Sequence, residues 1–187
     1  MYTKKIYFSG GDFHELQELF AWLPGVADTR VGYINAADCA DYDRVARGEI
    51  KAYMGVEVVY NPKKIDLSKL MDVFFAAVNP YAPDGQGKRR GEMFRSGVFY
   101  VAAEDEPQVE LHLNFIANRG KTPAANCVGL TVNDPNSDPK LARHCYSLAG
   151  ELQNFQEAEP EHQHYLQKNS HEETFIDFVK LKEYLKF

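Results

Sequence analysis

Residues 10–33 read GGDFHELQELFAWLPGVADTRVGY, and this stretch decides the fold. Its apolar side chains recur at steps of three and four from Phe13 onwards, which predicts an amphipathic helix. Asp12 stands at the natural N-cap, and Glu15 three residues later predicts an acidic version of the capping box. A Pro-Gly pair ends the helix, and residues 26–35 then read as a strand.

Strands and helices continue on both sides of this stretch. The other elements predicted in the first hundred residues are a strand over 5–9, a strand over 51–60, a helix over 65–78 capped by Asp66 or Ser68, and a strand over 94–102. Adjacent strands with helices packed on them predict an α+β fold. We expect a two-layer domain with a split βαβ, ferredoxin-like core.

The connections and the second half of the chain are less regular. We expect a polar loop over 36–49 with a helical turn around 42–46, and a long loop over 79–93. Residues 107–119 fit a strand or a helix, and Pro107 with Gly120 favours the helix. Further predictions are a short apolar stretch over 127–132, a strand over 145–155, a helix over 160–169 and an amphipathic C-terminal helix over 174–187. With no repeat or linker in the sequence, we expect one domain over 1–187.

Composition narrows the class of protein. The 187 residues carry a formal net charge of −6, which argues against a general nucleic-acid binder. The sequence has no apolar run long enough for a membrane helix and no signal-peptide pattern at its start. Its 3 cysteines form no CxxC pair, which favours a reducing, cytoplasmic location.

Several segments, taken in order, resemble a known family. The opening stretch resembles the Gly-Cys-Phe-Trp box, helix, Leu-Pro-Gly-Val and strand of A-type peptide methionine sulfoxide reductases. Further matches are YDRVARG at 42–48, VEVVYNP at 56–62, LMDVFFAAVNP at 70–80, QG at 86–87, Gly91, RS at 95–96 and AEPEHQHYLQKN at 158–169. The resemblance covers 6–100 most strongly and returns at 155–169.

The resemblance implies a thiol reaction at the start of the first long helix. In that family a Cys thiolate attacks the sulfoxide sulfur and becomes a sulfenic acid. A second thiol resolves the sulfenic acid to a disulfide, which thioredoxin reduces. A carboxylic acid and tyrosine hydroxyls assist protonation, and an aromatic pair holds the methyl group. The family needs no bound cofactor.

This chain departs from the family at most of those positions. Asp12 stands in place of the nucleophilic Cys, His14 in place of the Trp, Met54 in place of the proton-donating Glu, Arg89 in place of a loop Asp, and Phe94 in place of a Tyr. Phe13 and Tyr42 are retained, and the C-terminal segment has no resolving Cys. We therefore expect a homologue without reductase activity that keeps these residues as a pocket for a peptide side chain or a small molecule.

Other interpretations remain open. Asp12 either caps its helix or lines a polar pocket with His14, and Lys88 with Arg89 either binds an anionic ligand or forms a solvated loop tip. The alternative function is a working reductase in which Cys39 is a relocated nucleophile, Cys127 or Cys145 resolves it, and thioredoxin is the partner.

Two further expectations concern the end of the chain. His162 and His164 would point in different directions on a helix, so we expect no metal site there. The C-terminal helix either packs on its own domain or binds a partner.

Overall fold

The computed structural model describes residues 2–117 and 144–185. Within them the helices are α1 (Phe13–Ala21), α2 (Tyr42–Ala46), α3 (Leu67–Ala77), α4 (Glu106–Ala117), α5 (Tyr165–Lys168) and α6 (Phe178–Leu185). Two 3-10 turns, η1 (Glu92–Phe94) and η2 (Ala103–Asp105), precede β6 and α4 respectively. The strands are β1 (Lys4–Ser9), β2 (Val26–Ile34), β3 (Tyr53–Tyr60), β4 (Gly85–Gln86), β5 (Arg89–Arg90), β6 (Gly97–Tyr100), β7 (Leu148–Glu151) and β8 (Phe155–Glu157).

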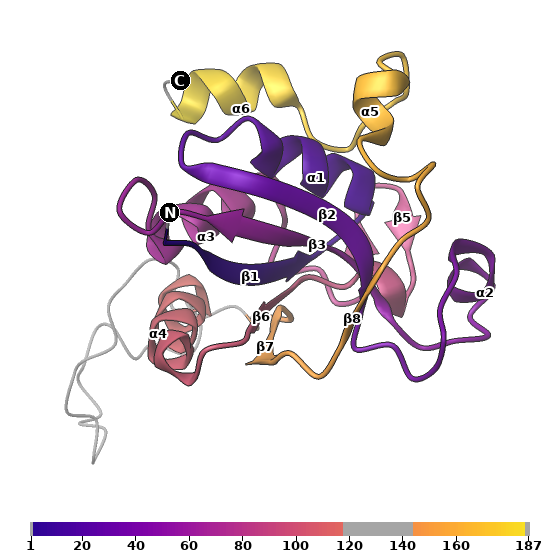
Figure 1. Cartoon of the computed structure of the whole chain (residues 1–187), viewed down its shortest axis with the longest axis horizontal. Coiled ribbons are helices and arrows are strands. Elements are labelled where there is room, and N and C mark those ends of the chain that lie inside the picture. The colour runs from indigo at the N-terminus through magenta and orange to yellow at the C-terminus, as the bar shows by residue number, and fades with distance from the viewer. Residues whose placement is uncertain (1, 118–143, 186–187) are drawn as a thin grey trace.

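The central sheet has the order β7-β6-β1-β3-β2-β8 (Figure 1). Its four inner strands are antiparallel to one another, β8 is antiparallel to β2, and β7 is parallel to β6. The helices α1 and α3 are the crossovers of two βαβ halves. The expected α+β fold with a split βαβ core is therefore confirmed. In each half the strand after the helix runs parallel to the strand before it, and one strand of the other half lies between the two.

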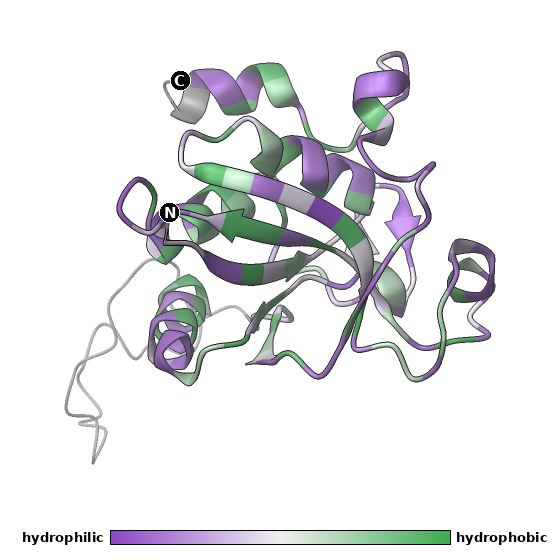
Figure 2. Cartoon of the chain, in the orientation of Figure 1, coloured by the Kyte–Doolittle hydropathy of each residue, from purple (hydrophilic) through white to green (hydrophobic). Residues whose placement is uncertain are grey.

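One face of the sheet carries the larger core. Its buried side chains come from the strands and from α1 and α3, and include Phe8, Phe20, Val56, Leu70 and Phe74. Phe8 stacks on Phe20 with centroids 4.6 Å apart. Polar and apolar bands follow one another along β2 in Figure 2, as expected for a strand with one buried face.

The helix predictions hold with shifted ends. Asp66 is the N-cap of α3, where its side chain accepts a hydrogen bond from the Lys69 N–H. The turn around 42–46 is α2, and the ambiguous segment is helical as α4, although residues 118 and 119 lie outside the described part. The short apolar stretch at 127–132 also lies outside it.

Three boundary predictions were wrong. The predicted strand over 145–155 is two strands at opposite edges of the sheet, because Asn154 binds the backbone of Ala36 and turns the chain across. In the predicted strand over 94–102, Phe94 is the last residue of η1, and only residues 97–100 pair with the sheet, as β6. The long loop over 79–93 contains the hairpin β4–β5.

The last segments also differ from their predictions. The helix expected over 160–169 is only α5, because His164 has a left-handed backbone (φ 52°) that interrupts it. The C-terminal helix begins at Phe178 rather than at 174. Its Leu181 is buried in the main core and Phe178 packs against it, so the segment packs on its own chain.

Candidate functional site

The site begins where β1 turns into α1. Gly10 and Gly11 both have positive φ, and a Cβ on Gly11 would lie 2.6 Å from the Phe175 ring. This turn puts Asp12 at the N-cap of α1, where its Oδ1 accepts the His14 backbone N–H at 3.0 Å. The expected capping role of Asp12 is therefore observed.

Asp12 also binds two side chains. His14 Nδ1 lies 2.9 Å from Oδ1, and Arg89 Nη2 lies 2.9 Å from Oδ2. Burial raises the pKa of the Asp12 carboxyl. The hydrogen bonds and charge of His14, followed by the charge of Arg89, lower this pKa by more than burial raises it, so the net pKa lies below its usual value. Asp12 is thus an ionised carboxylate with both oxygens occupied.

The hairpin β4–β5 supplies Arg89. Gln86 is buried at its base, where its side chain accepts from the Asn79 N–H and donates to the Asn79 carbonyl, both at 2.8 Å. Arg89 is half-exposed, whereas Lys88 is almost fully exposed and pairs with the equally exposed Glu173. Within the Lys88–Arg89 pair, only Arg89 belongs to the site, and Lys88 is the solvated tip.

A second segment brings His162 to the start of α1. The Gln163 side chain makes the hydrogen bonds to Val31 of β2 that a neighbouring strand would otherwise make. Its Oε1 accepts from the Val31 N–H at 3.0 Å, and its Nε2 donates to the Val31 carbonyl at 2.9 Å. Glu159 receives hydrogen bonds from the Tyr33 hydroxyl and the Tyr42 N–H. These bonds attach the segment to β2 and α2 and fix the position of His162.

Four aromatic rings stack in sequence across the site. Tyr42 stacks on His162 at 4.5 Å, and His14 stacks on Tyr165 at 4.4 Å. Between the two pairs, His14 Nε2 lies 3.0 Å from His162 Nδ1, which is hydrogen-bond distance. Burial, followed by the nearby His14, lowers the pKa of the His162 imidazole.

These groups line a cavity of about 260 Å³. Its lining residues are Asp12, His14, Glu15, Tyr42, Arg89, His162, Tyr165, Leu166, Glu172 and Glu173. The two interpretations of Asp12 hold together, since it caps the helix and lines a polar cavity with His14. The aromatic rings and carboxylates make this a small site with a polar mouth.

Glu15 does not form the predicted capping box. Instead of reaching back to the Asp12 N–H, its Oε2 accepts the Ile176 N–H at 3.0 Å. Burial raises the pKa of Glu15 to about 7, and the negative charge of Asp12 adds to the rise. The prediction was wrong because a partner 161 residues away in sequence competes for this carboxylate.

Three predicted pocket residues lie behind the cavity instead of lining it. Phe13, Met54 and Phe94 are buried in an apolar cluster with Val31 and Tyr33. The residues that sequence reasoning missed are Glu15, His162, Tyr165, Leu166, Glu172 and Glu173. The AEPEHQHYLQKN segment was the available signal for His162 and Tyr165, because it matched the same family as residue 12.

The cysteines lie away from the cavity lining. Cys39 is exposed on the loop before α2, and Cys145 is half-buried before β7, where burial raises the pKa of its thiol. Cys127 lies outside the described residues. Within the described ranges 2–117 and 144–185, histidines, cysteines and carboxylates form no group of three placed to hold a metal ion.

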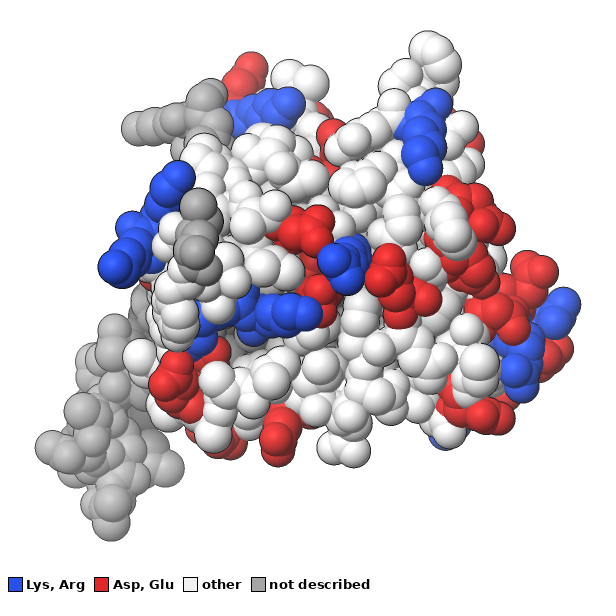
Figure 3. All heavy atoms as spheres, in the orientation of Figure 1, with Lys and Arg blue, Asp and Glu red and all other residues white. Residues whose placement is uncertain are grey.

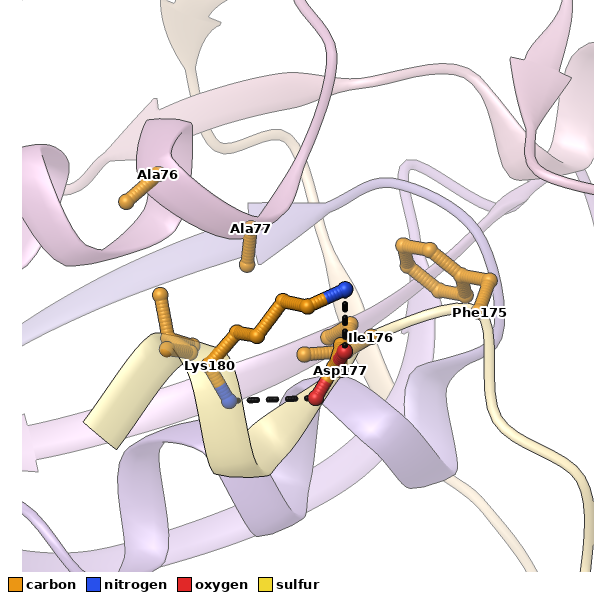
Figure 4. A pocket seen from close by; sticks show the side chains of 7 residues that line it. Ala76, Ala77, Phe175, Ile176, Asp177 and Lys180 are labelled. Atoms are coloured by element: carbon orange, nitrogen blue, oxygen red, sulfur yellow. Dashed lines mark hydrogen bonds and ion pairs between the residues drawn. The ribbon is translucent and has the colours of Figure 1, made fainter. Parts of the chain in front are cut away.

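Two more cavities lie elsewhere. One of about 450 Å³ separates the end of α3 from the C-terminal segment, with Ala76 and Ala77 facing Ile176 and the Asp177–Lys180 ion pair (Figure 4). The other, of about 390 Å³, lies between α2 and η1. On the face drawn in Figure 3, basic and acidic side chains are interspersed. No helix in the described part is both long and apolar enough to cross a bilayer.

Comparison with known proteins identifies the family. The family model for peptide methionine sulfoxide reductase matches residues 4–134. The chain is 31% identical to MsrA of Mycoplasma pneumoniae over 94% of this chain and 99% of that protein. It is 33% identical to MsrA 2 of Rhodopirellula baltica over 89% of this chain and 86% of that protein. The chain therefore belongs to the peptide methionine sulfoxide reductase family.

Solved structures show the same fold. Mxr1 from Saccharomyces cerevisiae in reduced form superimposes with a TM-score of 0.75 at 24% identity, covering 92% of this chain and 88% of that one. Methionine sulfoxide reductase A of Corynebacterium diphtheriae also gives 0.75, at 22% identity over 92% of this chain and 77% of that one. Mxr1 in complex with Trx2 matches at 0.54 and 20% identity, over 87% of this chain and 84% of that one.

Proposed function

We propose that this family member does not reduce methionine sulfoxide at the start of α1, and that the cavity there serves as a ligand-binding site. The observation that carries the proposal is Asp12 itself. A carboxylate cannot accept the sulfoxide oxygen and supply two electrons, as a thiolate does. Both Asp12 oxygens are bound by His14 and Arg89, so the residue acts as a helix cap and an anchor.

The surroundings of Asp12 support the same conclusion. Met54 and Phe94, which stand where the family has an acid and a tyrosine, are buried apolar residues and cannot transfer a proton. The Tyr42 hydroxyl remains, but burial and the charge of Asp12 raise its pKa. The redox sulfur at position 12 and the acid at position 54 are thus both absent, while the cavity persists.

The alternative is a working reductase that uses Cys39. Its support is the exposure of that thiol on the loop leading into α2, whose first residue Tyr42 lines the cavity. In this case Cys127 or Cys145 resolves the sulfenic acid, and thioredoxin reduces the disulfide. The proposal and its alternative differ in whether a thiol is consumed by substrate.

One assay separates them. A peptide carrying methionine S-sulfoxide is incubated with the protein and dithiothreitol, alongside Cys39→Ser and, as a matched control, Cys145→Ser. We expect no turnover by any of the three proteins and no loss of free thiol on titration. Turnover that disappears only in Cys39→Ser would establish the alternative, and turnover that survives in Cys39→Ser would contradict both.

A further inference from the structure

A chain of hydrogen bonds crosses the cavity wall from Asp12 through His14 to His162. The distances are 2.9 Å from Asp12 Oδ1 to His14 Nδ1 and 3.0 Å from His14 Nε2 to His162 Nδ1. Asp12 is 7% exposed and His14 is 8% exposed. The first two members are therefore buried in the wall of the cavity, and His162, which also lines it, is the more exposed end of the chain.

The ionised carboxylate sets the direction of this chain. A carboxylate only accepts hydrogen bonds, so His14 donates through Nδ1. In its uncharged form the His14 imidazole has a single N–H, so its Nε2 then accepts the Nδ1–H of His162. His162 then presents Nε2 without a proton. Among the described residues no hydrogen bond to that atom is found, so His162, which lines the cavity, has a vacant acceptor.

The rest of the lining is also rich in acceptors and aromatic faces. Glu15, Glu172 and Glu173 contribute carboxylates, and Tyr42 and Tyr165 contribute rings. The Lys88–Glu173 pair is almost fully exposed and binds weakly. Arg89 is already paired with Asp12 through Nη2, which offsets part of its charge before any ligand binds.

We propose that the cavity binds a primary ammonium group on an apolar stem, as at the end of a lysine side chain. The ammonium donates one N–H to His162 Nε2 and others to the carboxylates, while the stem and the charge lie against the tyrosine rings. Asp12 and His14 are positioning residues, because they act only by fixing the tautomer of His162. This inference rests on the proposed function, in which the cavity is a ligand site.

The test uses the full-length protein labelled with ¹⁵N and long-range spectra of the histidine rings at pH 8. The probe is Nα-acetyl-L-lysine methylamide, and the control probe is its neutral Nε-acetyl derivative. We expect His162 to show a protonated Nδ1 and an unprotonated Nε2 before any probe is added. The lysine probe should then shift the His162 and His14 signals in a saturable way and leave those of His112 and His171 unchanged.

Two substitutions of His14 test the positioning role. His14→Phe keeps the stacking on Tyr165 but cannot accept from His162, so the probe affinity should fall about tenfold or more and the His162 tautomer should no longer be fixed. His14→Gln offers a side-chain oxygen to His162 Nδ1 and should restore most of the affinity. Glu172→Gln should weaken binding severalfold, whereas Glu110→Gln on α4, a matched exposed glutamate, should not.

Several outcomes would overturn the inference: a protonated Nε2 on His162, equal shifts with the charged and neutral probes, or no shift with either. Acetate that shifts the same signals would also overturn it, yet would leave the cavity as a ligand site. Turnover of the sulfoxide peptide is a separate readout and counts only against the proposed function.

Discussion

The Oε2 of Glu15 accepts the backbone N–H of Ile176 at 3.0 Å, which ties the first turn of α1 to the segment just before α6. Glu15 is 5% exposed, and the tie crosses from one end of the sequence to the other. The same carboxylate lines the cavity that contains His162. Folding of the C-terminal segment and the charge of the site therefore share one titrating group.

Glu15→Gln should flatten the dependence of stability on pH. The folded-state pKa of Glu15 is about 7, above the 4.5 of the free side chain, so its contribution is complete below pH 4.5 and is lost as the pH rises through 7. At pH 8 the variant should be more stable than the wild type by at most about 3 kcal/mol, and at pH 5 the difference should be much smaller. Urea denaturation at the two pH values checks this, with Glu18→Gln on the same helix as the control. Equal effects at both pH values would show that burial does not perturb this carboxyl.

Asp12→Ala should destabilise the protein more than loss of a simple cap does. Asp66→Ala in α3 removes one exposed cap bond and should cost about 1 kcal/mol. Asp12→Ala also removes the partners of His14 and Arg89, so we expect about 2–3 kcal/mol at pH 7.

The excess cost of Asp12→Ala should depend on pH. The folded-state pKa of Asp12 lies below 3.8, so its contribution is present above pH 3.8 and is lost as the pH falls through the folded value. The difference between the two alanine variants, measured by urea denaturation, should shrink below pH 4. A constant difference would mean that the ionised carboxylate of Asp12 does not contribute.

Asp12→Cys should place an acidic thiol at the start of α1. The helix N-terminus, His14 and Arg89 surround this position, and each favours an anion there. The pKa of the new thiol should lie below the usual value of about 8.5. Iodoacetamide labelling against pH, read by peptide mass spectrometry, gives this pKa and includes Cys39 as an internal control. A midpoint at or above that of Cys39 would contradict the prediction.

Gln163→Leu should release His162 from the site. The substitution leaves the buried Val31 N–H without its partner and removes one of the two hydrogen bonds to the Val31 carbonyl, which still accepts the Ala158 N–H, so we expect a loss of about 1–3 kcal/mol. The ring signals of His162 should move toward those of a free histidine while the fold persists. Gln167→Leu on the exposed side of α5 is the matched control and should change neither property. If the His162 signals stay in place, the Gln163 amide is not what positions the ring.

Local sequence determined β1, β2 and β3, the helices α1 and α3, and the caps of these two helices. Apolar spacing from Phe13 onwards and an acidic residue before each helix depend only on neighbours in the chain, so α1, α3 and their Asp12 and Asp66 caps could be predicted. The sulfur-free residue at position 12 was likewise visible in the sequence. The family followed from the order of the matching segments.

Tertiary structure alone decided which groups meet at the site. The Glu15 carboxylate accepts the Ile176 N–H instead of capping α1 through the Asp12 N–H. Arg89 reaches Asp12 from the hairpin β4–β5, whose sequence has no periodic pattern. His162 meets His14 only because the Gln163 amide replaces a strand beside Val31. Such contacts join residues 77–161 positions apart, and their free energy depends on burial and on competing partners that no local pattern encodes.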